Sequence, residues 1–388
     1  MNDREPELLI IYFLVVSSSP TNISRIILYR SQIKLKEPFI ISLGPLEFAS
    51  NVIVEIQTGN GLRGFGECSP FLTIHGESID TGMIIGKYLA GVLLGKNPID
   101  IRNCISLMEN AIFANSCIKS AFDIALYDLV SKQAGMPLYH FLGGKNDKVM
   151  HTDFTVSLGE KGKMVADAVR IKDNGFRFIK VKLGEDPSSD LGRINAIRQA
   201  VGSEITLRID ANQGWNYEDA LTILNELNAY GIQHCEEPIP RWDFMRLASL
   251  RKKSPVQIMA DESCFDHRDA ERLISLNACD RINVKLGKSG GLFNAIKIIR
   301  LAEKANLPMQ AGGFLESRLG FTATAHMALC SDQICFYDFD SPLMFESDPV
   351  TGGIIYGAKG LVTVPESEGL GASFDPGYLK DLDKVVVR

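Results

Sequence analysis

The chain has 388 residues, of which 45% are hydrophobic and 23% are charged, as is typical of a soluble globular protein. This length accommodates a barrel of about 250 residues and a second, smaller domain. The formal net charge is −6 and no long run of Lys and Arg is present, which argues against a nucleic-acid partner. The eight cysteines contain no C-x-x-C pair. We interpret them as buried thiols in a reducing compartment and expect a cytoplasmic protein.

Residues 8–16 form an unbroken apolar run near the N-terminus. The run is too short to span a bilayer, and the acidic residues around Arg4 outnumber the positive charge that a signal peptide needs. We therefore expect residues 1–22 to be an N-terminal extension, with export as the alternative, and we expect no membrane partner.

The segment of residues 23–145 begins with strands and continues with helices. A hairpin turn is predicted at Gly59-Asn60-Gly61, and strands followed by helices are typical of an α+β domain. The strands are expected at residues 26–35, 51–58 and 62–68, and the helices at residues 77–94, 98–113 and 116–134.

In residues 146–345 strands and helices alternate instead, which predicts an α/β barrel of eight strands with seven intervening helices. The C-terminal segment, residues 346–388, shows no such alternation, and we expect it to return to the first domain. The barrel strands are predicted at residues 152–157, 178–183, 205–210, 232–236, 256–261, 281–286, 308–312 and 335–339.

A charged residue closes five successive strands of this barrel: Lys182, Asp210, Glu236, Asp261 and Lys285. Each lies at the end of a short apolar run, and one strand with its helix and loops takes about 25 residues. The carboxyl ends of parallel barrel strands share one rim, where such barrels have their active sites. The five side chains are therefore expected to lie together.

The three acidic residues, Asp210, Glu236 and Asp261, would direct oxygen ligands from neighbouring strands toward one point. Hard anionic oxygens without His or Cys favour Mg²⁺, with Mn²⁺ also possible. The alternative for any one of them is a cap of the following helix.

The lysines flank this set, because Lys182 precedes it by one strand and Lys285 follows it by one strand. Lys180 lies two residues before Lys182 on the same face. We expect the nearby positive charges to lower the pKa of a catalytic lysine toward neutrality. Lys180 is a third candidate catalytic residue, and the alternative is a barrel-lining lysine paired with a carboxylate. A metal between opposed amines suits removal of a proton α to a carboxylate, and two bases suit racemisation or epimerisation.

These segments resemble the enolase superfamily in its muconate-lactonising subgroup, from about Ile23 to the C-terminus. The resemblance implies a (β/α)7β modified TIM barrel with an α+β capping domain, one Mg²⁺ per subunit on the three carboxylates, and Lys182 and Lys285 as bases acting through an enolate. It is carried by Lys180-Val181-Lys182, Asp210-Ala211-Asn212, Glu236-Glu237-Pro238, Asp261-Glu262-Ser263 and Asn283-Val284-Lys285.

Within this family, Asp338-Phe339-Asp340 is similar to the D-x-D signature of the dipeptide epimerases, whose two aspartates bind the α-ammonium group of a dipeptide. Two like carboxylates at a barrel mouth repel each other unless a cation lies between them. A solvated acidic loop is the alternative. Further substrate-binding or supporting residues implied by the resemblance are Thr155, Gly313, Asn212, Glu262 and Glu316.

Side-chain specificity is expected from two loops of the capping domain, residues 39–46 and 71–77. The first loop offers Phe39, Ser42, Leu43 and Gly44 but no cation, where glutamate-specific epimerases supply an arginine. An unpaired substrate carboxylate is costly to desolvate. We therefore predict epimerisation of the C-terminal residue of a small or hydrophobic dipeptide such as Ala-Ala or Ala-Val, by a homo-oligomeric enzyme.

Three alternatives remain open. A lyase on the same scaffold, an o-succinylbenzoate synthase or a cycloisomerase, would act on acids without an ammonium group. An N-acylamino acid racemase would likewise not use Asp338 and Asp340. A non-catalytic metal-binding or scaffold protein would not require both lysines. Gly287-Lys288-Ser289 mimics the end of a phosphate-binding loop but lacks its first glycine.

Overall fold

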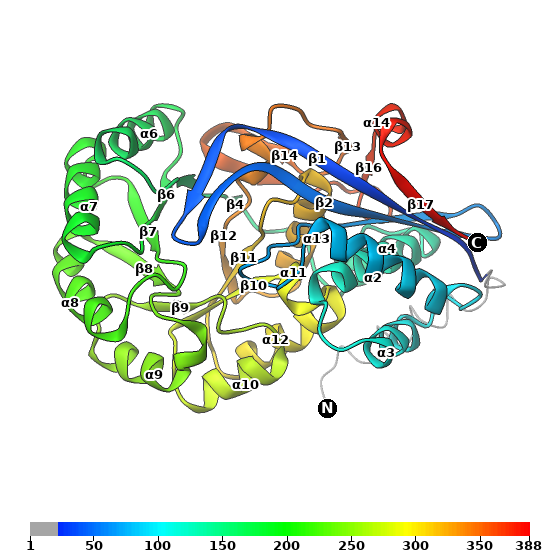
Figure 1. Ribbon diagram of the computed structural model, residues 1–388, viewed down its shortest axis with the longest axis horizontal. Helices are drawn as coiled ribbons and strands as arrows, with labels where there is room; N and C mark the ends of the chain where they lie inside the picture. Colours follow the sequence, from blue (N-terminus) through cyan, green and yellow to red (C-terminus); the bar gives the residue numbers. More distant parts are fainter. Residues whose placement is uncertain (1–21) are drawn as a thin grey trace.

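The computed structural model describes residues 22–388, so the predicted N-terminal extension lies outside the described residues except for Asn22. The capping domain begins with a long antiparallel hairpin (Figure 1). Its strands belong to a sheet in the order β17-β1-β2-β3, formed by β1 (Ile23–Ile41), β2 (Gly44–Thr58), β3 (Arg63–Cys68) and β17 (Lys384–Val387).

Four helices follow β3 in the chain: α2 (Ile79–Leu93), α3 (Ile101–Ala111), α4 (Ser116–Gln133) and α5 (Leu138–Phe141). Helix α4 lies directly on β3, because Gly64 and Gly66 have no side chain. A Cβ atom on either glycine would lie 2.1 or 1.9 Å from a carbonyl oxygen of α4, which is closer than atoms can approach. The helix is buried along nearly its whole length, and it also contacts α11 and α12 of the second domain.

The second domain is a sheet of eight parallel strands in sequential order, with helices around its outside (Figure 1). The strands are β5 (Phe154–Val156), β6 (Phe178–Lys182), β7 (Thr206–Asp210), β8 (Ile232–Glu236), β9 (Ile258–Ala260), β10 (Arg281–Lys285), β11 (Met309–Gly312) and β12 (Ile334–Tyr337). The helices between them are α6 (Lys161–Asp173), α7 (Pro187–Val201), α8 (Tyr217–Leu227), α9 (Phe244–Lys253), α10 (His267–Ser275), α11 (Leu286–Ser289) with α12 (Leu292–Lys304), and α13 (Arg318–Ala328).

The first and last strands of this sheet lie side by side. The backbone N–H of Asp153 donates to the carbonyl of Tyr337, and the N–H of Phe339 donates to the hydroxyl of Thr152. After β12 the described chain enters a short 3-10 turn (Ser341–Met344) instead of an eighth helix. The predicted fold class, a TIM-like barrel with an α+β capping domain, is therefore confirmed.

The C-terminal segment contacts the capping domain at several points: Glu346 pairs with Lys34, the N–H of Leu370 donates to Asp128, and β17 pairs with β1 after α14 (Pro376–Asp381). Before β17, two small sheets form. One joins β13 (Val350–Gly352) to β16 (Ala372–Phe374), and the other joins β14 (Ile355–Tyr356) and β15 (Leu361–Thr363) to β4 (Met150–His151) beside the barrel. The domain boundaries at residues 22/23, 145/146 and 345/346 stay a prediction.

Residues 39–46 were expected to be a loop, and that expectation is wrong. They form the tip of the β1–β2 hairpin, where Phe39 pairs with Leu46 and Ile41 with Gly44, which leaves a two-residue turn. Gly44 has φ of +123°, a conformation that residues with a Cβ rarely adopt. The hairpin therefore carries its inward side chains on a rigid support.

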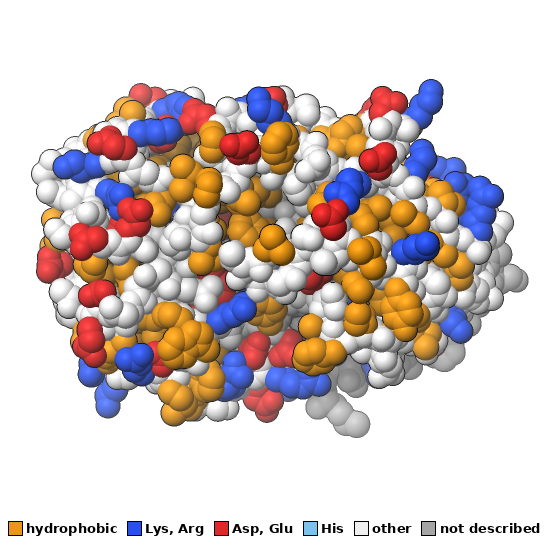
Figure 2. Space-filling model, viewed as in Figure 1, with side chains coloured by type: hydrophobic (Ala, Val, Ile, Leu, Met, Phe, Trp, Pro, Cys, Tyr) orange, Lys and Arg blue, Asp and Glu red, His pale blue; other side chains and the backbone are white. Residues whose placement is uncertain are grey.

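Among the described residues, no helix is long and apolar enough to cross a lipid bilayer. On the face shown in Figure 2, acidic and basic side chains are interspersed, and neither charge covers a large continuous area.

Candidate active site

The ends of the barrel strands bring the five predicted charged residues to one rim. Lys182 is in register with Asp210, and Asp210 is in register with Glu236. Asp261 directly follows β9, and Lys285 ends β10. All five side chains are buried. Strands β6 and β10 are separated by three strands on the eight-stranded sheet, so the two lysines project from opposite sides of the barrel.

Lys182 is held by the strand that follows its own. Its Nζ donates to Asp210 Oδ2 at 2.7 Å and to Asn212 Oδ1 at 2.9 Å. Asn212 has φ of +42°, and its Nδ2 donates to Glu262 Oε1 at 3.2 Å. The predicted supporting residues Asn212 and Glu262 are thus linked to Lys182 through hydrogen bonds.

Lys285 has a similar environment on the other side. Its Nζ lies 2.7 Å from Asp261 Oδ2 and 3.7 Å from Glu236 Oε1. Burial disfavours the charged amine, but the carboxylates of Asp261 and Glu236 outweigh burial and raise the pKa of Lys285 above its usual value. The expected lowering of a lysine pKa is therefore not found for Lys285 in the protein alone, because carboxylates surround it.

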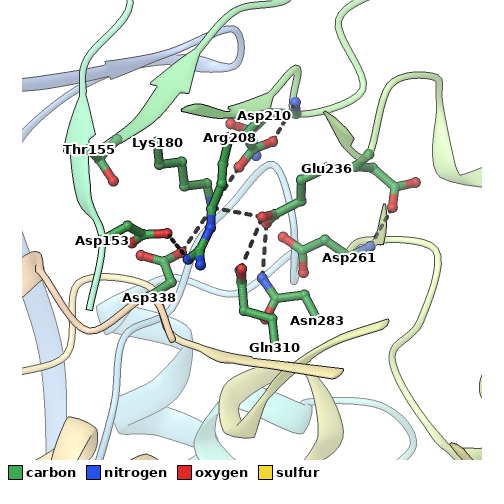
Figure 3. A network of polar contacts seen from close by, with 12 residues as sticks. Asp153, Thr155, Lys180, Arg208, Asp210, Glu236, Asp261, Asn283, Gln310 and Asp338 are labelled. Carbon is green, nitrogen blue, oxygen red and sulfur yellow. Dashed lines mark hydrogen bonds and ion pairs between the residues drawn. The ribbon is translucent and has the colours of Figure 1, made fainter. Parts of the chain in front are cut away.

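Lys180 lies at the centre of the carboxylates (Figure 3). Its Nζ is 3.0 Å from Asp210, 2.9 Å from Glu236 and 2.8 Å from Asp338. Burial opposes its charge, yet Asp338, Glu236 and Asp210 raise the pKa of Lys180 well above its usual value. This residue is therefore a protonated hydrogen-bond donor that neutralises part of the acidic cluster.

Asp210, Glu236 and Asp261 are fully buried, and they lie at the ends of three neighbouring strands, β7, β8 and β9. The two oxygens of Glu236 accept hydrogen bonds from Asn283 Nδ2 at 3.0 Å and Gln310 Nε2 at 3.2 Å (Figure 3). Burial and the negative charge of Asp210 raise the pKa of Glu236 to about 7. Three hard oxygen donors that repel one another in a buried site fit a divalent cation such as Mg²⁺.

A second acidic group lies across the rim. Asp153, Asp338 and Asp340 are buried, and each has a carboxylate oxygen within 4.8 Å of the others. Among the described residues this group meets a geometric criterion for holding a metal, whereas Asp210, Glu236 and Asp261 do not meet it. Asp153 pairs with Arg208 at 2.7 Å, and Asp340 accepts the N–H of Thr155 at 2.6 Å. Burial and the charge of Asp338 raise the pKa of Asp340 to about 7, which indicates a site that would be stabilised by a further cation.

A pocket opens at this rim, and its acidic lining residues are Asp338 and Asp340, whereas Asp210, Glu236 and Asp261 do not line it. Its polar residues are Thr155, Lys180, Lys182, Asn212, Lys285, Asp338, Asp340 and Ser341. Its apolar residues come from the hairpin tip, from the second predicted specificity loop and from the segment after β11: Phe39, Ile41, Phe71, Ile74, Phe314 and Leu315. Polar groups at the strand ends and apolar groups above them are suited to a small molecule with a charged backbone and an apolar side chain.

Gly313, Glu316 and Ser42 differ in their relation to the pocket. Gly313 lines the pocket, and a Cβ there would lie 2.5 Å from the Phe321 ring and 2.8 Å from Glu316. Glu316 accepts the N–H of Phe314 at 2.6 Å, and burial raises its pKa to about 7. The Ser42 hydroxyl donates to backbone carbonyls after β7. The turn residues 42–44 do not line the pocket.

Ile41, Phe71 and Ile74 line the pocket and lie within the two predicted specificity segments, although none of them was singled out. Phe314, Leu315 and Ser341 also line it and were not predicted as substrate-binding residues. Strand alternation could have identified Ile41, since residues two apart on a strand face the same side and Phe39 was already singled out. Phe314 carries no such periodic signal, because it belongs to an irregular segment between β11 and α13.

Comparisons with known proteins agree with this architecture. Residues 23–143 match the family described as Mandelate racemase / muconate lactonizing enzyme, N-terminal domain, and residues 163–378 match Enolase C-terminal domain-like. The chain is 58% identical to the D-Ala-D/L-Ala epimerase of Cytophaga hutchinsonii, over 94% of this chain and 100% of the relative.

Two solved structures are similar to the chain throughout. A dipeptide epimerase from Cytophaga hutchinsonii complexed with Mg and D-Ala-L-Val has a TM-score of 0.94 and 57% identity, and the match covers 95% of this chain and 100% of that one. A dipeptide epimerase from Enterococcus faecalis complexed with Mg and L-Leu-L-Tyr has a TM-score of 0.88 and 38% identity, with 91% and 99% covered.

Proposed function

Because the chain belongs to the mandelate racemase / muconate lactonizing enzyme family of the enolase superfamily, we propose that it is a Mg²⁺-dependent epimerase of small apolar dipeptides. It inverts the α-carbon of the C-terminal residue. The observation that carries this proposal is the placement of Lys182 and Lys285 on opposite strands, with buried carboxylates between them and the Asp338–Asp340 pair at the adjoining rim.

Asp210, Glu236 and Asp261 are the residues that would hold Mg²⁺. When bound, the metal ion supplies Lewis-acid stabilisation of the negative charge that develops on the substrate carboxylate. Each of the two lysines carries out one of the two proton transfers. One removes the α-proton from one face of the substrate, and the other, protonated by solvent, returns a proton to the opposite face. Either direction of epimerisation uses the same pair in reversed roles.

Lys180 acts as a hydrogen-bond donor and a positive counter-charge and not as a base. Its contacts with Asp210, Glu236 and Asp338 keep it protonated, and it fixes the position of Asp338 relative to the metal ligands. Asp338 and Asp340 bind the α-ammonium group of the dipeptide. That ammonium supplies the cation that relieves the repulsion between the two carboxylates.

The pocket walls select the substrate. In the part of the chain that the structure describes, the only cations lining the pocket are Lys180, Lys182 and Lys285, and all three already face carboxylates. No charge is left for an acidic substrate side chain, whose desolvation would cost several kcal/mol. By likeness to the Cytophaga relative, we infer alanine as the first residue and alanine or valine as the second.

We place the enzyme in the cytoplasm, because six of its eight cysteines are buried, as expected for structural thiols in a reducing compartment. Assembly into a homo-oligomer stays a prediction.

The test is exchange of the substrate α-proton with D₂O, followed by ¹H NMR, for a panel of dipeptides in the presence of Mg²⁺. We expect exchange and epimerisation of D-Ala-D-Ala and D-Ala-L-Val and little turnover of Ala-Glu. Equal turnover of Ala-Glu and Ala-Ala would contradict the proposed substrate class. Exchange of N-acylated amino acids but of no dipeptide would favour the racemase alternative.

A further inference from the structure

Each of the two opposed lysines lies over the face of an aromatic ring. We propose that Phe39 and Phe314 are positioning residues for the reaction, each of which holds the amine of one base against the substrate. This inference rests on the proposed function, since it assigns Phe39 to the face served by Lys182 and Phe314 to the face served by Lys285.

The geometry is alike on the two sides. Lys182 Nζ lies 5.8 Å from the centre of the Phe39 ring, and Lys285 Nζ lies 4.8 Å from the centre of the Phe314 ring. Both distances are within the range of about 6 Å over which an ammonium group is attracted to a ring face. Both rings also line the pocket. The two lysines therefore share one arrangement, with a carboxylate on one side and a ring on the other.

Each ring is held by its own backbone. Phe39 lies in the paired part of the hairpin, opposite Leu46, and the carbonyl of Ile40 accepts the N–H of Leu158 from the barrel at 2.9 Å. Phe314 donates its N–H to Glu316 at 2.6 Å and accepts the Ser341 hydroxyl at 2.6 Å. Anchored in this way, the rings can restrict the lysines.

The Phe314 ring is also held by its neighbours. Its centre lies 4.5 Å from the His75 ring and 6.0 Å from the Phe71 ring, and only 8% of the residue is exposed. The ring therefore has little freedom to move away from Lys285.

A long lysine side chain needs such a restriction. Lys182 makes hydrogen bonds to Asp210 and Asn212, and Lys285 makes one to Asp261, which leaves each amine free to swing about those contacts. A ring face beside Nζ offers no lone pair and excludes water from that side. It leaves the carboxylate and the pocket as the directions in which the amine can point. The ring thereby keeps Nζ aimed at the α-carbon.

The experiment compares Phe39→Leu and Phe314→Leu with Ile41→Leu as the control. Ile41 lines the same pocket but has no ring, so its replacement alters the pocket wall and keeps both rings. For each variant, the initial rate of α-proton exchange in D₂O is measured at saturating substrate, separately from each epimer of D-Ala-Ala. Exchange from one epimer reports one lysine, whereas net epimerisation would combine both.

We expect Phe39→Leu and Phe314→Leu each to slow α-proton exchange from one epimer about fivefold more than from the other. The epimer that is slowed more should differ between the two variants. Ile41→Leu should affect both epimers equally. Equal effects of Phe39→Leu and Phe314→Leu on both epimers, a preference shared by the two variants, or the same asymmetry in Ile41→Leu would overturn the inference. Where a leucine variant does not fold, the methionine variant of the same position is measured. Absence of exchange in the unmodified enzyme would instead contradict the proposed function.

Discussion

Replacement of Asp338 by asparagine tests the ammonium site directly, because it removes one negative charge with almost no change in shape. Asp338 Oδ2 lies 2.8 Å from Lys180 Nζ, and its side chain is 10% exposed. In the Asp338→Asn variant, Lys180 keeps its contacts with Asp210 and Glu236. A bound substrate ammonium, in contrast, would lose one of its two carboxylates.

Loss of one partner from a buried charge pair costs about 3 kcal/mol. Since about 1.4 kcal/mol corresponds to a factor of ten, kcat/KM for D-Ala-Ala should fall about 150-fold. The folded state loses less, because Lys180 retains two of three carboxylates, and Tm should change by only about 3 °C. Coupled measurement of epimerisation by polarimetry and of unfolding by calorimetry separates the two effects.

Asp167→Asn is the matched control, since Asp167 pairs with the exposed side chains of Lys163 and Arg170 on the outside of the barrel. It should leave kcat/KM unchanged. If Asp338→Asn kept kcat/KM within about threefold of the unmodified enzyme, no ammonium group would be bound there. A lyase or an N-acylamino acid racemase would then explain the site better.

Three further outcomes follow from the same site. Lys285→Ala should abolish epimerisation, but the α-proton of one epimer should still exchange with D₂O, because Lys182 still acts on its own face of the substrate. Exchange from both epimers would refute the two-base arrangement. Mg²⁺ at 100 times its Kd should raise Tm by about 5 °C. The Asp261→Asn variant should lose this rise in Tm, and the Asp153→Asn variant should keep it. The opposite result would place the metal in the second acidic group, Asp153, Asp338 and Asp340. Because the ionised form of Asp340 binds the ammonium and burial raises the pKa of this residue to about 7, kcat/KM should fall as pH decreases below 7. A pH–rate profile of Asp340→Asn should lack that limb, and an unchanged limb would assign it to another group.

The sequence by itself determined the rim of the barrel. Apolar strands at a regular interval end in Lys182, Asp210, Glu236, Asp261 and Lys285, and parallel strands necessarily present their carboxyl ends on one side. Strand alternation likewise put Lys180 on the same face as Lys182. Such features follow from repeats of two residues along a strand and of one strand-helix unit along the barrel, so they can be read without knowledge of tertiary contacts.

Only the tertiary structure decided what surrounds those residues. The three carboxylates around Lys180 come from β7, β8 and the segment after β12, and this environment raises the pKa of Lys180 well above its usual value. The rings beside the two bases come from the capping hairpin and from an irregular segment after β11. No local period connects Phe39 with Lys182 or Phe314 with Lys285. The contact of Phe39 arises because the hairpin packs over the barrel mouth, and the contact of Phe314 arises because the segment after β11 lies beside the end of β10. Packing between such segments depends on the shapes of whole domains.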